Sequence, residues 1–159
     1  MIDRCRPSGL AMAVLEAKDL VIRTKRIEEG GRGTFLEISF EGVHTHHWPA
    51  GCDVAAFVEG EIRAAVPSAC LFDFLHYEYG FGNEIVGLFF YPLNARIPVA
   101  IVVQSGPEWS RPDVLSLRGF ITALKLDKLP DCGLFEDAES GYAFLRDRVD
   151  RRADPLSPG

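Results

Sequence analysis

The stretch that decides the fold is Ala69-Cys70-Leu71-Phe72-Asp73-Phe74-Leu75, an apolar run that only Asp73 interrupts. A continuous run of this length is typical of a strand that is covered on both faces of its sheet. Helical periodicity is expected on either side of it, over residues 53–66 before the run and residues 85–94 after it. Asp53 is expected to cap the first of these helices, and Val66 is expected at the end of its inward apolar stripe. A buried strand between two helices predicts parallel strands joined by helical crossovers.

Two strands are expected upstream of the first helix. One begins at Leu20 and ends at residues 28–33 (EEGGRG), and the next covers residues 34–40. The glycines between them adopt positive φ at little cost, which favours a β-hairpin, and residues 41–42 (EG) mark a further turn. Residues 1–17 are expected to form an N-terminal arm, of which residues 11–15 dock as a short helix or a strand.

The downstream half continues the alternation of strands and helices. We expect a buried strand over residues 98–103, a helix over residues 115–126, a short strand over residues 132–135 and a last helix from Asp137 or Ser140 to Val149. In the helix over residues 115–126, the side chains expected to point inward are Leu117, Phe120, Ile121 and Leu124. The order β-β-α-β-α-β-α-β-α predicts an α/β fold with a mixed, mostly parallel sheet in one domain, residues 18–150, followed by a flexible tail, residues 151–159.

Composition restricts the class of protein. The chain has 159 residues, 47% of them hydrophobic and 25% charged, which suits one globular domain. The net charge of -6 and the scattered Lys and Arg residues argue against nucleic-acid binding, which needs clustered positive charge. The apolar runs are too short to span a membrane, and the four cysteines form no CxxC pair. The sequence therefore indicates a cytoplasmic protein.

The order of elements resembles the STAS domain, the fold of bacterial anti-sigma-factor antagonists and of sulphate-transporter tails. The resemblance covers residues 20–149, and residues 69–75 carry most of it, because they are similar to the family's apolar strand before its phosphoacceptor loop and second helix. Residues 94–99 (NARIPV) and 134–140 (LFEDAES) are similar to two further stretches of that family. The resemblance implies a signalling module that binds another protein, without a cofactor and without catalysing a reaction.

One departure from the family pattern concerns the phosphoacceptor. In partner-switching members a Ser or Thr at the start of the second helix is phosphorylated. Counted from Asp73, that position falls at about Asn83, and residues 79–84 (YGFGNE) contain no Ser or Thr. Phosphorylation of the family's usual kind is therefore not expected at this turn.

The favoured binding site combines this turn with a later loop. Gly80 and Gly82 allow a tight turn, Phe81 between them is a candidate contact residue, and the following helix start offers unpaired N–H groups. The alternative is a plain turn in which Asn83 caps the helix. Trp109, in a loop rich in proline, is a further contact candidate, since aromatic residues are enriched in interfaces, but it could equally fold over the core. A protein partner is expected, and a homodimer stays open.

A rival interpretation assigns the strand end to small-ligand binding or catalysis. Asp73, His76 and Glu78 could perform acid–base chemistry, in a β-α fold that resembles the crotonase or Clp-protease folds. No nucleophile with a matching base accompanies them. An Asp within an apolar strand commonly accepts a hydrogen bond from nearby backbone, which is the structural alternative.

A metal site is the third candidate. His44 and His46, two positions apart on a strand, would point to the same face. Only Cys52 and His76 could complete the three or four ligands that such a site needs. The histidines serve equally well as solvated loop residues, so the sequence assigns no metal.

Overall fold

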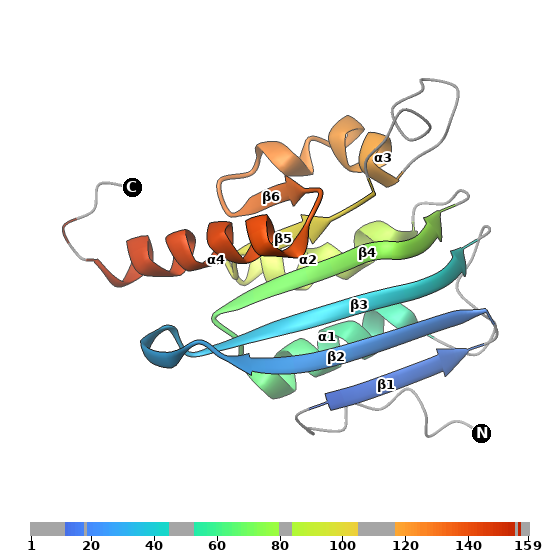
Figure 1. Ribbon diagram of the computed structural model, residues 1–159, viewed down its shortest axis with the longest axis horizontal. Helices are drawn as coiled ribbons and strands as arrows, with labels where there is room; N and C mark the ends of the chain where they lie inside the picture. Colours follow the sequence, from blue (N-terminus) through green and yellow to red (C-terminus); the bar gives the residue numbers. More distant parts are fainter. Residues whose placement is uncertain are drawn as a thin grey trace.

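The computed structural model describes residues 12–17, 19–44, 53–79, 84–104, 117–154 and 156, with the backbone alone for Ala17, His44 and Tyr79. Strands and helices alternate along most of the chain (Figure 1). The elements in chain order are β1 (Met12–Ala17), β2 (Leu20–Glu28), the 3-10 helix η2 (Gly30–Arg32), β3 (Thr34–His44), α1 (Val54–Ala65), β4 (Ala69–Tyr79), the 3-10 helix η3 (Glu84–Val86), α2 (Gly87–Asn94), β5 (Val99–Val102), α3 (Leu117–Ala123), the 3-10 helix η5 (Leu126–Lys128), β6 (Cys132–Phe135) and α4 (Ala138–Ala153).

The six strands form one sheet in which the spatial order follows the chain, β1-β2-β3-β4-β5-β6. The pairs β1–β2 and β2–β3 are antiparallel, whereas β3–β4, β4–β5 and β5–β6 are parallel. The predicted α/β fold with a mixed, mostly parallel sheet is therefore confirmed. Of the two forms expected for residues 11–15, the structure has the strand, because Met12–Ala17 pair along their whole length with β2.

Helices cover the two faces of the sheet unequally. One face carries the larger core, to which α1, α2 and α3 contribute, and its largest fully buried side chains include Phe40, Phe57, Phe72, Phe74 and Phe89. The other face is covered by α4, which lies over β4, β5 and β6 (Figure 1). Among the described elements no helix covers that second face over β1 and β2, and we call this part of the described sheet its open face.

The predicted central strand accounts for this two-sided packing. Along β4, Cys70, Phe72 and Phe74 face the larger core, while Ala69 and Leu71 face α4. All five side chains are buried. The strand is longer than the apolar run and continues to Tyr79, so the polar residues after Leu75 belong to the strand and not to the following turn.

The predictions for the two ends of α1 differ in their outcome. Asp53 caps the helix as predicted, since its carboxylate accepts a hydrogen bond from the Ala56 N–H at 2.9 Å. Val66, expected on the inward stripe, is instead 81% exposed. It lies one residue past the helix, because Pro67 disfavours right-handed helical geometry in the residue before it, and it adopts left-handed backbone with φ of 46°.

The prediction of a turn at residues 41–42 is wrong. β3 continues through Gly42 to His44 and pairs with β2 and β4 on either side. Gly42 has φ of +121°, and a Cβ at this position would lie 1.8 Å from the carbonyl oxygen of Asp19. The glycine therefore allows the close approach of β3 to the carbonyl of Asp19, in the turn before β2, and does not reverse the chain.

None of the helices in the described ranges is long and apolar enough to cross a membrane.

Candidate functional site

The residues expected to bind a partner, Gly80, Phe81, Gly82, Asn83 and Trp109, lie outside the described residues. The metal candidate His46 lies outside them as well, and His44 is described by its backbone alone. The elements that follow the two expected binding segments are described. They are η3 with α2, which begin directly after residue 83, and α3, which begins directly after residue 116.

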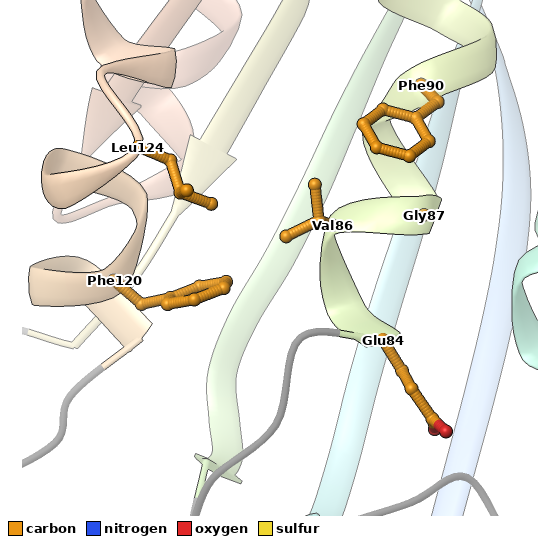
Figure 2. Close-up of a pocket in the computed structure, with 6 residues that line it drawn as sticks. All are labelled: Glu84, Val86, Gly87, Phe90, Phe120 and Leu124. Carbon is orange, nitrogen blue, oxygen red and sulfur yellow. The ribbon is translucent and has the colours of Figure 1, made fainter.

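An apolar groove separates these two elements (Figure 2). It encloses about 490 Å³ and is lined by Glu84, Val86, Gly87, Phe90, Phe120 and Leu124. Figure 2 shows Val86 and Phe90 on one wall and Phe120 and Leu124 on the other, with the side chains of the two walls directed toward one another. The Glu84 side chain points away from the opposite wall.

The first wall is fixed by residues that alternate between core and groove. Ile85, Leu88 and Phe89 are buried in the larger core and hold η3 and α2 against the sheet. Because a helix turns through about 100° per residue, Phe90 cannot share the orientation of Phe89, and 59% of it is exposed.

The second wall is made in the same way by α3. Leu117 and Ile121 occupy one face of this short helix and are buried. Phe120 is only partly buried, and Leu124 is 44% exposed. The sequence placed both of these side chains inward. That prediction is wrong for Leu124, because the helix ends at Ala123 and Lys125 adopts left-handed backbone with φ of 57°.

The groove is suited to apolar contact. Its two walls present four apolar side chains, and two of them, Phe90 and Leu124, belong to the large hydrophobic residues that the structure leaves exposed. The one ionisable side chain among the six lining residues is Glu84, which points away from the opposite wall (Figure 2). The arrangement can hold an apolar side chain or a small apolar molecule.

The acidic and imidazole side chains of the rival site lie elsewhere, on β4. Asp73 accepts a hydrogen bond from the Leu75 N–H at 2.9 Å, and Gln104 Nε2 donates to the Leu75 carbonyl at 2.6 Å. These bonds hold the irregularity by which β4 carries one residue more than β3 between the pairs 39–73 and 41–76. Asp73 thus makes the backbone contact that was the structural alternative.

His76 and Glu78 are exposed on the last part of β4, paired in register with Glu41 and Val43 of β3. They do not line the apolar groove. Within the described part of the chain, no group of three or more His, Cys, Asp and Glu residues is arranged to hold a metal ion.

Two cysteines can be placed, and both are free thiols in the core. Burial raises the pKa of Cys70 far above its ordinary value, and burial together with the nearby Asp127 raises the pKa of Cys132 to about 12. Both thiols therefore stay protonated at neutral pH and do not act as nucleophiles.

The groove residues Val86 and Phe90 were not recognised from the sequence as site residues. The signal was present in the run Leu88-Phe89-Phe90, because three consecutive apolar residues of a helix cannot all face one core. Without the position of α3, however, nothing in the sequence shows that the third residue faces another apolar wall.

Comparison with known proteins finds no match for this chain, since no family model, no curated protein and no solved structure is significantly similar to it.

Proposed function

We propose that the chain is a STAS-like protein-interaction module that binds a partner protein through the groove between α2 and α3, without phosphorylation at residues 79–84. The observation that carries the proposal is the apolar groove at the start of the second helix. This is the position at which the family resemblance places the contact with a partner.

The exposed side chains support a protein partner. Phe90 and Leu124 expose 59% and 44% of their surface, although burying a side chain of this size is favourable by about 1.5–3 kcal/mol. Protein interfaces gain most of their binding energy from a few such apolar anchors that fill pockets. A groove of about 490 Å³ accommodates a few large side chains of a partner helix or extended segment.

The position of the groove in the chain supports the same function. Its first wall begins at Glu84, directly after the glycine-rich turn, and its second wall belongs to the helix that follows the Trp109 loop. The two segments expected from the sequence to contact a partner therefore each lead directly into one wall of the groove.

Small-ligand binding or catalysis by Asp73, His76 and Glu78 remains the rival proposal. It has less support, because the Asp73 carboxylate is occupied by the N–H of its own strand and the other two side chains are exposed. Acid–base catalysis usually requires groups that converge on a site shielded from water.

The test is capture of binding proteins by the purified chain, immobilised and exposed to lysate of its native host. Phe90→Glu and Leu124→Glu place a charge in the groove, while Val66→Glu places the same charge on a residue that is 81% exposed at the end of α1. We expect both groove variants to lose a captured protein that the wild type and Val66→Glu retain. Capture that is unaffected by both groove variants would contradict the docking surface.

Asp73→Asn, combined with His76→Ala, tests the rival site in the same assay. These changes leave the groove intact, so the captured protein should remain bound. Loss of capture with this variant and not with Phe90→Glu would transfer the binding site to the end of β4.

A further inference from the structure

We infer that the chain forms a symmetric dimer in which strand β1 pairs antiparallel with β1 of a second copy, so that the two sheets become continuous. This inference is independent of the groove between α2 and α3. It rests on the contrast between the two edges of the sheet and on the pattern of side chains along β1.

The two edges of the sheet differ in their protection. β6 has only four residues, and its first N–H is used by a hydrogen bond from Cys132 to the Leu129 carbonyl at 3.1 Å. The 3-10 helix η5 also lies against this strand. Short strands and covering elements are the usual means by which proteins prevent pairing at an edge.

β1 carries none of these protections among the described residues. Its sequence MAVLEA contains no Pro, Lys or Gly, and its six pairs with β2 run without a bulge. One side of the strand is bonded to β2, while no described strand pairs with the other side. β1 lies at the edge of the described sheet (Figure 1). In an edge strand, alternate N–H and carbonyl groups point outward and can bond to another strand.

The side chains of β1 fit a second copy of the same strand. The side toward the core is already filled, since Ala13 and Leu15 are buried, whereas Met12 and Val14 on the open face are 57% and 47% exposed. With Val14 on the two-fold axis, Val14 lies opposite the same residue of the second copy. Met12 then lies opposite Glu16 of the second copy, so the apolar Val14 pair lies on the open face between two Met12–Glu16 pairs.

Charge complementarity favours this register. Lys25 of β2 lies opposite Glu37 of β3 in its own copy and opposite Met12 of β1 on its other side, so in the dimer it also stands two strands from Glu16 of the second copy, about 10 Å between backbones. Long Lys and Glu side chains bridge that distance across Met12. Within one copy, the residue directly opposite Glu16 is the uncharged Val21, so the dimer provides a cation that the direct partner within one copy does not.

The contact area predicts a weak dimer. Pairing of two six-residue strands buries less surface than the roughly 1,200–2,000 Å² of a standard stable interface. We therefore expect dissociation to be visible on dilution. Sedimentation of the wild-type protein over a range of micromolar concentrations should show a transition from 17.6 kDa to twice that mass.

Disulfide trapping tests the register. Val14→Cys, in a chain whose Cys5 and Cys52 are replaced by Ser, should form a covalent dimer on mild oxidation, because directly opposite Cβ atoms in antiparallel strands lie about 4.5–5.5 Å apart. Val43→Cys is the matched control, since Val43 is 45% exposed on β3 of the same sheet. We expect trapping of the first variant to be at least about tenfold faster.

A charged residue on the two-fold axis tests the dimer without a cross-link. Val14→Lys places two like charges opposite each other and should weaken association about tenfold or more, whereas Val43→Lys should not. A wild-type protein that stays monomeric throughout the concentration range overturns the inference. That result would hold whether the edge of β1 binds another protein or is occupied by residues 1–11. Equal trapping rates for the two cysteine variants overturn it as well.

Discussion

Arg146 of α4 binds Glu29, the residue before η2, through two parallel hydrogen bonds, from Nε to Oε2 at 2.9 Å and from Nη2 to Oε1 at 3.0 Å. One helical turn later the same arrangement recurs, with Arg32 donating from Nε and Nη2 to the Asp150 carboxylate at 2.8 and 3.0 Å. These two pairs join the last helix to the connection between β2 and β3. They are 117 and 118 residues apart in the chain.

We expect acid to destabilise the protein through these pairs. The hydrogen bond from Arg146 lowers the pKa of Glu29, and that from Arg32 lowers the pKa of Asp150. A carboxylate whose pKa is lower in the folded state stabilises the fold fully above its unfolded pKa, here near 4.5 and 3.8, and that contribution is lost as the pH falls through the folded pKa. Urea unfolding between pH 7 and pH 3 measures this loss.

The variant Arg146→Met should reduce the dependence on pH, because Glu29 then loses the partner that lowers its pKa. Its stability at pH 7 should fall by about 1 kcal/mol, the upper range for a surface ion pair, since the contact is bidentate and the Glu29 side chain is only 13% exposed. Arg151→Met is the control, because Arg151 pairs with Asp147 inside α4 and joins no other element. Equal pH profiles for Arg146→Met and the wild type would refute the assignment.

Tyr142 should remain protonated in strong base. Burial, followed by the hydrogen bond to Glu37, raises the pKa of Tyr142 well above its ordinary value of 10. Titration of tyrosine absorbance near 295 nm should therefore show that ionisation of Tyr142 in the native wild type is delayed until the protein unfolds. In Tyr142→Phe this delayed step should be missing.

The same substitution should cost stability. Tyr142→Phe leaves the half-buried Glu37 carboxylate without its donor, which we expect to cost about 1–3 kcal/mol. Tyr91→Phe is the matched control, since its ring lies 4.1 Å from the Arg63 guanidinium and is retained in the variant. A loss that is equal in the two variants would mean that the hydrogen bond to Glu37 is not the cause.

Gly42→Ala should be strongly destabilising, by about 2 kcal/mol or more. The added methyl group would overlap the Asp19 carbonyl oxygen, and φ of +121° is unfavourable for alanine. Gly31→Ala is the control, because a Cβ at that position meets nothing within 4 Å and its effect should be within about 0.5 kcal/mol. Denaturant unfolding of both variants decides the matter, and a tolerated Gly42→Ala would show that β2 and β3 can separate here.

Two phenylalanines should behave in opposite ways. Phe72 is fully buried and contacts the rings of Phe40, Phe74 and Phe89, so Phe72→Ala should cost about 3–5 kcal/mol. Phe90 is mostly exposed in the groove, and Phe90→Ala should cost about 1 kcal/mol or less while reducing partner capture. A large loss of stability in Phe90→Ala would assign this residue to the core.

Sequence patterns were reliable where one physical cause dominates. β6 was predicted with its observed bounds because the apolar run Cys132–Phe135 ends before two acids, and Asp53 and Asp137 cap their helices as local capping chemistry requires. β4 was recognised because its residues are apolar toward both faces. In each of these cases, neighbouring residues contain the whole signal.

Patterns failed where a distant contact decides. In the sequence alone, Gly42 is typical of a turn residue. Its role becomes clear only from the structure, in which the carbonyl of Asp19, the residue before β2, lies beside it. Leu124 fits an inward helical stripe, but α3 ends before it and the side chain meets the groove. The groove itself needs two helices about 30 residues apart in the chain to be placed side by side, which no local window of sequence specifies.

The agreement between spatial and chain order of the strands has a consequence for how the protein is made. Each strand pairs with the one synthesised just before it, so the sheet can grow stepwise while the ribosome is still extending the chain. α4, the last of the described helices, returns to the connection between β2 and β3, through Arg146 and Asp150. We expect nascent chains that stop after β6 to contain a formed sheet of low stability, which α4 then stabilises by packing on it.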